Sequence, residues 1–164
     1  MNPTSLSPSL KLRRTRKLRR TKKVLAFGTF DLLHKGHIFY LEEAKKLGDE
    51  LYVMVACDQA VKWAKGFTPE ERERERLRKV KKMGFVDFAW IGEPVFRIED
   101  YLRPILKIKP NIICLGYDQA LNEEEWLKGK IREMDPKPKI VRTKPFKKHL
   151  YKTSIIKKRV REIR

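Results

Sequence analysis

Two histidines, His34 and His37, lie where an apolar run gives way to a helical pattern. The apolar run at 24–27 is long enough for a buried strand, and the sequence G-T-F-D at 28–31 interrupts it with a glycine turn. Apolar residues then recur at helical spacing from 38 to 47. The start of a helix favours phosphate, because its first N–H groups are unpaired and lie at the positive end of the helix dipole. We therefore expect both imidazoles to face one anion.

The pattern G-T-F-D-x-x-H-x-G-H, at residues 28–37, resembles the signature of the cytidylyltransferase-like nucleotidyltransferases. The resemblance implies an enzyme that joins a nucleoside triphosphate to a phosphate-bearing acceptor and releases pyrophosphate. The alternative interpretation is a pair of structural histidines at the start of a helix. The chain has only three histidines and two of them fall in this motif, which favours the functional interpretation. The resemblance extends over residues 24–164.

The bulk properties of the chain are those of one intracellular domain. Its 164 residues can bury a sizeable core. No apolar run is long enough to cross a membrane, and none resembles a secretory signal. Cys57 and Cys114 each lie inside an apolar run, so we predict buried, reduced thiols. These features predict a cytoplasmic protein.

Basic residues outnumber acidic ones, and the excess is concentrated at the start of the chain. The 40 lysines and arginines face 21 acidic residues, which gives a net charge of +19. Nine of the basic residues and none of the acidic ones fall within 1–23. We predict that 1–23 is a basic, disordered extension of a nucleotidyltransferase domain at 24–164, and that 11–23 either stays solvated or binds polyanions weakly. Such a charge suits nucleotides and nucleic acids alike. A nucleic-acid-binding protein on a nucleotidyltransferase scaffold is therefore an alternative of another class.

Strands and helices alternate along the rest of the chain. After the first strand, buried strands are predicted at 51–57, 85–91, 111–115 and 139–142. Helices are predicted at 69–83, with Thr68 as its cap, and at 98–108, 122–134 and 155–163. The segment 58–66 is predicted to be a loop. This alternation is typical of a single-domain, doubly wound, Rossmann-like α/β fold with a parallel sheet.

Three motifs follow predicted strands. The G-T-F-D and H-K-G-H sequences follow the first strand, Lys62 and Lys65 follow the second, and G-Y-D-Q at 116–119 follows the fourth. In doubly wound folds, ligands bind beyond the carboxyl ends of the strands, where the strand order switches. We expect the three motifs to meet in one crevice.

The resemblance to the nucleotidyltransferases also implies roles for individual residues. A lysine after the second strand would contact the triphosphate, and the sequence does not decide between Lys62 and Lys65. Asp118 would read the nucleotide, or would be a turn residue. Arg76 would be the family's arginine upstream of a V-D strand, or an exposed helix charge. The residues implied to be catalytic are His34, His37, Lys62 and Arg142. Those implied to bind nucleotide are Gly28, Thr29, Phe30, His34, Lys35, Gly36, His37, Asp118, Thr153 and Ser154.

The acceptor is inferred from the sequence at 116–119. Glycerol-phosphate cytidylyltransferases resemble this chain but carry G-D-D-W there, whereas L-G-Y-D-Q is similar to the archaeal-type FAD synthases. That resemblance implies transfer of AMP from ATP to FMN, with Mg²⁺ or another divalent cation bound to ATP and with no metal site on the protein. It also implies a homodimer. A glycerol-3-phosphate cytidylyltransferase that uses CTP is the alternative within the family.

Overall fold

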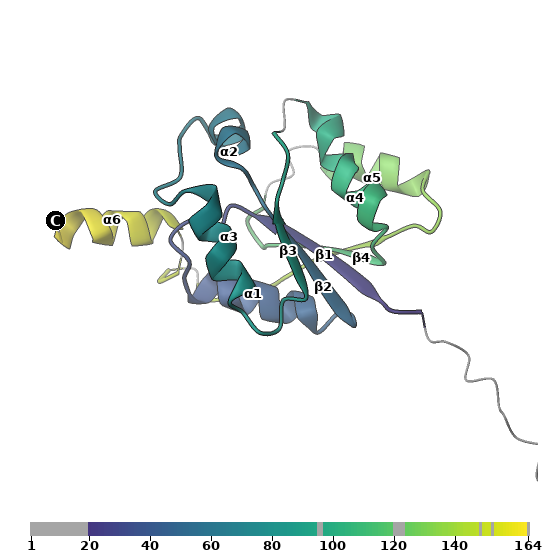
Figure 1. Cartoon of the computed structure of the whole chain (residues 1–164), viewed down its shortest axis with the longest axis horizontal. Coiled ribbons are helices and arrows are strands. Elements are labelled where there is room, and N and C mark those ends of the chain that lie inside the picture. The colour runs from purple at the N-terminus through teal and green to yellow at the C-terminus, as the bar shows by residue number, and fades with distance from the viewer. Residues whose placement is uncertain (1–19, 95–96, 120–123, 148, 152, 164) are drawn as a thin grey trace, which may run out of the picture.

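Five parallel strands form one sheet in the order β3-β2-β1-β4-β5 (Figure 1). The structure, a computed structural model, describes residues 20–94, 97–119, 124–147, 149–151 and 153–163. The strands are β1 (Lys23–Gly28), β2 (Glu50–Val55), β3 (Phe88–Ile91), β4 (Ile112–Leu115) and β5 (Lys139–Arg142). The predicted doubly wound, Rossmann-like sheet is therefore confirmed.

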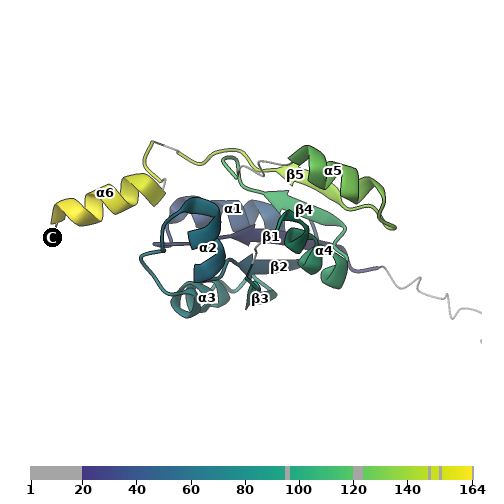
Figure 2. The same cartoon turned by 90° about the horizontal axis from the view of Figure 1, so that it is seen from above.

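Helices cover both faces of the sheet (Figures 1 and 2). On one face lie α1 (Lys35–Lys45) and α3 (Glu73–Lys81), and on the other lie α4 (Leu102–Ile108) and α5 (Glu124–Arg132). A short 3-10 turn, Ile98–Tyr101, leads into α4. Beyond the carboxyl ends of the strands lie α2 (Asp58–Lys65) and α6 (Thr153–Ile163), and α6 stands apart from the helices that cover the sheet.

Alternate residues of β1 point to opposite faces of the sheet and contribute to two cores. Val24 and Ala26 belong to the core beneath α1 and α3. Leu25 and Phe27 belong to the core beneath α4 and α5. The chain passes from β1 outward to β3 and then returns to β4 on the other side of β1, so the strand order switches between β1 and β4. In such folds this switch is where a ligand crevice forms.

The segment 58–66, predicted to be a loop, is mostly helix α2. Cys57 caps this helix, since its Sγ accepts a hydrogen bond from the backbone N–H of Ala60 (3.4 Å). Gly66 ends it in the left-handed conformation, with φ of 74°. Cysteine is not among the usual N-cap residues, so the sequence gives little indication of where this helix begins.

Helix α3 begins at Glu73, well after its predicted cap at Thr68. The segment before it is held by a contact from a distant part of the chain. The backbone N–H groups of Glu70 and Glu71 donate to the carboxylate of Asp31, at 3.1 and 3.0 Å. Asp31 thus satisfies the N–H groups of Glu70 and Glu71, which lie in the segment before α3.

Several other boundaries differ from the prediction by a few residues; for example, the strand predicted at 51–57 ends at Val55. The third strand begins at Phe88 instead of residue 85, because the N–H of Val86 turns back to the carbonyl of Met83 (3.0 Å). The helix predicted at 122–134 is α5, and its predicted cap, Asn122, lies outside the described residues.

The predicted extension at 1–23 can be compared with the structure only at residues 20–23. Lys23 belongs to β1, and its N–H donates to Oδ1 of Asn111 (2.8 Å). The carbonyl of Lys22 accepts hydrogen bonds from the N–H groups of Asp49 (2.8 Å) and Glu50 (3.2 Å). The sheet therefore depends on the last residues of the predicted extension.

Deleting residues 2–19 should leave the stability of the domain unchanged. Deleting residues 2–23 should lower the free energy of unfolding by about 2 kcal/mol, because it removes several backbone hydrogen bonds to β2 and Asn111 that are worth about 1 kcal/mol each. Urea unfolding of the two truncated proteins measures the difference. Equal stability of the two would contradict the start of β1 at Lys23.

Candidate functional site

His34 is the N-terminal cap of α1, and the helix that it starts fixes its ring. Its backbone is extended, and its Nδ1 accepts a hydrogen bond from the backbone N–H of Gly36 (3.1 Å). With Nδ1 used as an acceptor, the neutral ring carries its proton on Nε2. His34 therefore has an N–H donor on the edge of the ring that the helix backbone does not use.

His37 lies in the first turn of α1 and stacks on His34. The two ring centroids are 3.8 Å apart, and the ring of Phe30 packs edge-on against His37 at 5.6 Å. Burial, together with the charges of His34 and Lys65, lowers the pKa of His37 to about 3. Burial also lowers the pKa of His34, against the opposing effect of Asp118. The rings are therefore hydrogen-bonding groups rather than cations at neutral pH.

The G-T-F-D loop brings its backbone close to these rings. A Cβ at Gly28 would lie 2.7 Å from the ring of Phe30, so a larger residue would displace that ring. Phe30 has a φ of 54°, and its ring packs against both His37 and Tyr40. Left-handed backbone at a bulky residue is rare and is concentrated at functional sites.

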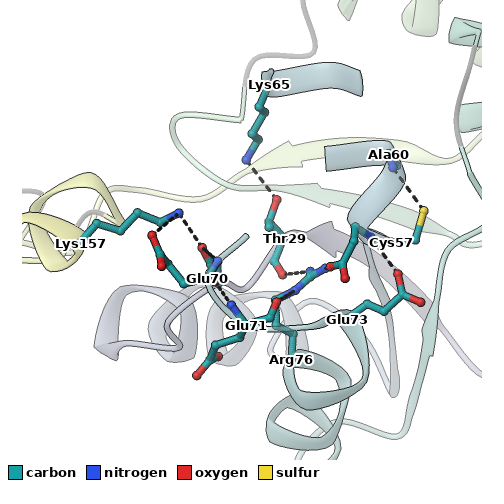
Figure 3. Close-up of polar contacts among 11 residues, drawn as sticks. Thr29, Cys57, Ala60, Lys65, Glu70, Glu71, Glu73, Arg76 and Lys157 are labelled. Carbon is teal, nitrogen blue, oxygen red and sulfur yellow. Dashed lines mark hydrogen bonds and ion pairs between the residues drawn. The ribbon is translucent and has the colours of Figure 1, made fainter. Parts of the chain in front are cut away.

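Lys65 reaches the same loop from the end of α2 (Figure 3). Its Nζ donates to Oγ1 of Thr29 (3.0 Å). Partial burial lowers the pKa of Lys65, against the opposing charges of Asp118 and Asp31. Both lysines are exposed to solvent on α2, but Lys62 has no such contact among the described residues. The structure therefore brings Lys65, and not Lys62, to the G-T-F-D loop.

Arg76 of α3 is fully buried beneath this loop, which corrects the alternative interpretation of an exposed helix charge. Its guanidinium donates to the backbone carbonyls of Thr29 and Glu71 and forms an ion pair with Asp58 at 2.7 Å (Figure 3). One side chain thus holds the G-T-F-D loop, the start of α2 and the segment before α3. The planar guanidinium, with five N–H donors, suits this position.

Asp31, the acid of G-T-F-D, is buried and ties α6 to the loop. Its carboxylate accepts hydrogen bonds from the N–H groups of Glu70 and Glu71. It also forms an ion pair with Lys157 of α6 at 2.9 Å. Figure 3 shows the Lys157 side chain pointing from α6 toward this loop. Burial raises the pKa of Asp31, but these partners outweigh burial and hold it below its ordinary value. Sequence reasoning missed this link, since Lys157 lies among other basic residues of the last helix.

The G-Y-D-Q sequence lies at the carboxyl end of β4, beside β1. Nε2 of Gln119 donates to the carbonyl of Phe27 (2.7 Å), and its Oε1 accepts from the N–H of Gly116 (2.9 Å). Arg142, at the end of β5, donates to the carbonyls of Gly116 and Gln119, at 2.8 and 2.9 Å. The loop after β4 is thus held from both neighbouring strands. In the sequence, the only sign that Gln119 could help to hold this loop is its position just after a predicted strand.

Asp118 lies near both His34 and Lys65. It is exposed, and its charge raises the pKa of each of these two groups against their burial. The three residues come from the loops or helices that follow β1, β2 and β4. The predicted meeting of the three motifs is therefore found in the structure.

The start of α6 lies against the start of α1. A Cβ at Gly36 would lie 2.9 Å from the carbonyl oxygen of Tyr151, just before α6. The last helix begins at Thr153, whose side chain lies outside what the structure describes, and Ser154 is exposed. Lys35, the first residue of α1, is also exposed. Two helix N-termini, each a place that favours anions, therefore lie close together.

Three further observations bear on the chemistry. Among the described residues, no group of three or more His, Cys, Asp or Glu side chains is placed to hold a metal ion. In the same part of the chain, no helix is long and apolar enough to span a membrane. Cys57 and Cys114 are buried free thiols, as predicted.

Comparison with known proteins identifies the family of this chain. A family model described as cytidylyltransferase-like matches residues 25–159. The chain belongs to the cytidylyltransferase-like family. The match runs from β1 into α6, so it includes the histidine motif, Lys65 and the start of the last helix.

Relatives and a solved structure are similar over most of the chain. The FAD synthase of Ferroglobus placidus is 48% identical over 122 residues, which cover 74% of this chain and 75% of that protein. The FAD synthase of Methanohalophilus mahii is 40% identical over 141 residues, which cover 85% of this chain and 94% of that protein. A crystal structure from Thermoplasma volcanium, described as that of a lipopolysaccharide core biosynthesis protein, is 40% identical with a TM-score of 0.68. The matched part covers 77% of this chain and 98% of the chain in that crystal structure.

Proposed function

We propose that this protein is an FAD synthase, a nucleotidyltransferase that transfers AMP from ATP to FMN and releases pyrophosphate. FAD synthases that are 40–48% identical to it, and that match 74–85% of the chain, support this assignment. The observation that carries the chemistry is the stacked pair of His34 and His37 at the N-terminus of α1, with Lys65 at the same loop. Such a place favours phosphate oxygens.

The reaction needs no covalent intermediate on the protein. A phosphate oxygen of FMN attacks the α-phosphorus of ATP, in line with the departing group. A bond forms between that oxygen and the α-phosphorus, the bond from the α-phosphorus to the bridging oxygen breaks, and its electron pair leaves with pyrophosphate. The protein contributes by positioning the two phosphates and by stabilising the negative charge that develops on their oxygens.

His34 and His37 donate hydrogen bonds to the phosphates at the reacting centre. The low pKa of His37 and the lowered pKa of His34 keep both rings neutral before ATP binds. A neutral imidazole can donate to a phosphate oxygen without first taking up a proton. The residues that we expect to line the nucleotide are in the G-T-F-D loop and at the start of α1: Gly28, Thr29, Phe30, Lys35 and Gly36.

Lys65, rather than Lys62, is the lysine that we assign to the triphosphate. Its ammonium group donates to the Thr29 hydroxyl, a weak partner that phosphate can replace. The start of α6, with Thr153 and Ser154, would supply backbone N–H groups to the same phosphates. Arg142 adds positive charge there and holds the loop in which Asp118 would read the nucleotide.

Mg²⁺ would come to this site bound to ATP. The described residues contain no cluster of ligands for it, and Asp31 is already taken by Lys157 and two backbone N–H groups. Lys65 and the start of α6 would hold the phosphates that carry the ion, and no carboxylate of the protein would be needed for it. When bound, the ion neutralises part of the phosphate charge.

A panel of substrates tests the assignment. The protein is incubated with Mg²⁺ and each pairing of ATP or CTP with FMN, glycerol 3-phosphate or no acceptor, and the products are separated by chromatography. FAD should form with ATP and FMN. Efficient formation of CDP-glycerol without FAD would instead assign the cytidylyltransferase branch. Salt-dependent binding to duplex DNA, without pyrophosphate release from any pair, would assign the nucleic-acid-binding alternative.

Lys65→Met should lower kcat/KM for ATP by roughly a hundredfold, because it removes a positive charge that stabilises the phosphates in the transition state. Lys62→Met, on the same helix, is the matched control and should change kcat/KM little. Initial rates of pyrophosphate release at varied ATP measure both. The reverse order of the two effects would assign the role to Lys62.

Three further features belong to this proposal. Residues 11–23 would bind polyanions weakly, and the affinity would fall as salt is added. The protein would form a homodimer and would work in the cytoplasm. Retention on heparin, with and without residues 2–19, measures the binding of polyanions. Sedimentation measures whether the protein is a dimer.

A further inference from the structure

A column of aromatic rings runs from the body of α1 to the histidine motif. Phe146 stacks on Phe39 of α1 with ring centroids 4.9 Å apart, and Tyr151 stacks on Phe146 at 5.7 Å. Tyr151 in turn faces His34 at 6.5 Å, with the ring planes 25° apart. These separations lie within the range of about 4.5–7 Å at which aromatic rings attract one another. His34 itself stacks on His37, so the column ends at the pair that we assign to the phosphates.

The backbone between β5 and α6 is folded to place these rings. The carbonyl of Lys147 accepts hydrogen bonds from the N–H groups of Leu150 (2.8 Å) and Tyr151 (3.1 Å). Lys147 has a φ of 40°, and its ammonium lies over the ring of Phe146 (5.9 Å to the centroid). This turn puts Phe146 and Tyr151 side by side with nearly parallel rings. The segment therefore contacts α1 through its rings.

The same segment contacts α1 through its backbone. The carbonyl of Tyr151 lies so close to Gly36 that a Cβ there would approach it to 2.9 Å. Beyond this point, α6 is tied to the body by Lys157, which pairs with Asp31. The start of α6 is therefore held between Tyr151 on one side and Lys157 on the other, and the Tyr151 ring also stacks with His34.

We propose that Tyr151, supported by Phe146, is a positioning residue that holds the ring of His34 and the start of α6 together as one phosphate-binding unit. The proposal rests on the function proposed above. The flat face of the Tyr151 ring does this work, so its hydroxyl is dispensable. Small misplacements of groups at a reacting centre are costly, and about 1 Å can reduce the rate a hundredfold.

The first test reads the His34 ring directly and does not depend on turnover. The imidazole resonances of the unliganded protein are followed by NMR as the pH is varied, in the parent, Tyr151→Phe and Tyr151→Ala. The Phe variant should match the parent. In the Ala variant the His34 resonances should shift and its pKa should rise toward the ordinary value, because the ring loses cover while Asp118 and His37 remain beside it. Unchanged His34 resonances in a folded Tyr151→Ala protein would overturn the proposal.

The second test uses the rate of FAD formation. Tyr151→Ala should lower kcat by roughly tenfold to a hundredfold, with little change in KM for FMN, and Tyr151→Phe should restore kcat. If Tyr151→Ala does not fold, Phe146→Leu takes its place, since it keeps the apolar volume and removes the ring that supports Tyr151. The control is Phe88→Ala, which breaks a similar stack with Tyr52 at the edge of the sheet (4.6 Å) and should leave kcat unchanged.

The outcomes separate this inference from the proposed function. A parent protein that makes no FAD would refute the proposed function, and the NMR comparison would still decide whether Tyr151 orients His34. A parent that makes FAD, with equal kcat in the parent and Tyr151→Ala, would refute the role of Tyr151 alone. Loss of kcat in Tyr151→Phe as large as in Tyr151→Ala would also refute it, because it would assign the effect to the hydroxyl.

Discussion

His37→Leu should lower the kcat of FAD formation by roughly a hundredfold or more, the usual cost of losing one hydrogen-bond donor at the transition state. Leucine has nearly the volume of histidine, so the space between Phe30 and His34 stays filled although the ring contacts are lost. Alanine would be a poorer choice, because His37 is packed between these two rings and its removal would leave a cavity. KM for FMN should change much less than kcat.

The third histidine of the chain provides the matched control for this experiment. His149 is exposed, so His149→Leu should leave kcat close to that of the parent. Thermal unfolding of both variants shows whether the fold is kept. A folded His37→Leu protein with the kcat of the parent would contradict the role of the paired imidazoles.

Arg76→Met should destabilise the fold by about 3 kcal/mol, at the low end of the range for removing one partner of a buried ion pair, since Asp58 is partly exposed. The variant leaves the carbonyls of Thr29 and Glu71 without the guanidinium donors that they have in the parent. Because Thr29 belongs to the G-T-F-D loop, the variant should also lose activity in conditions where it is still folded.

The control for Arg76 lies on the same helix. Arg78 is not buried, so Arg78→Met should change the free energy of unfolding by less than about 0.5 kcal/mol, as surface substitutions usually do. Urea unfolding of the two variants gives both numbers. Equal stability of Arg76→Met and Arg78→Met would contradict the burial of the Arg76 network.

The parts of the fold that could be predicted are those fixed by local pattern. The strands around 24–28 and 112–115 are nearly continuous apolar runs because helices cover both faces of the sheet, and such runs are visible in the sequence. The start of α1 could be predicted because a glycine turn, two histidines and a helical repeat follow one another. The meeting of three motifs followed from the rule that carboxyl ends of parallel strands share one edge.

The parts that could not be predicted depend on contacts between distant residues. Asp31, far away in the sequence, accepts hydrogen bonds from the N–H groups of Glu70 and Glu71 in the segment before α3. Arg76 lies in a run of charged residues, and only the position of α3 beneath the G-T-F-D loop buries it.

Lys62 and Lys65 can be told apart only when 58–65 is known to be a helix, whereas the sequence predicted a loop there. Residues four apart on a helix share a face, so Lys65 lies on the side of the buried Val61 and reaches inward to Thr29. Cys57, which caps that helix through its sulfur, is not a residue that usually indicates a helix start. With the segment taken as a loop, the two lysines could not be distinguished.

The central claim is that the site at His34, His37 and Lys65 transfers AMP from ATP to the phosphate of FMN. The most direct measurement uses ATP carrying a radioactive α-phosphorus, incubated with FMN, Mg²⁺ and either the parent protein or His37→Leu, followed by separation of the products. The label should appear in FAD with the parent, with an equal amount of pyrophosphate, and should appear at least roughly a hundredfold more slowly with His37→Leu. Label that stays in ATP with the parent, or that enters FAD equally fast with both proteins, would contradict the claim.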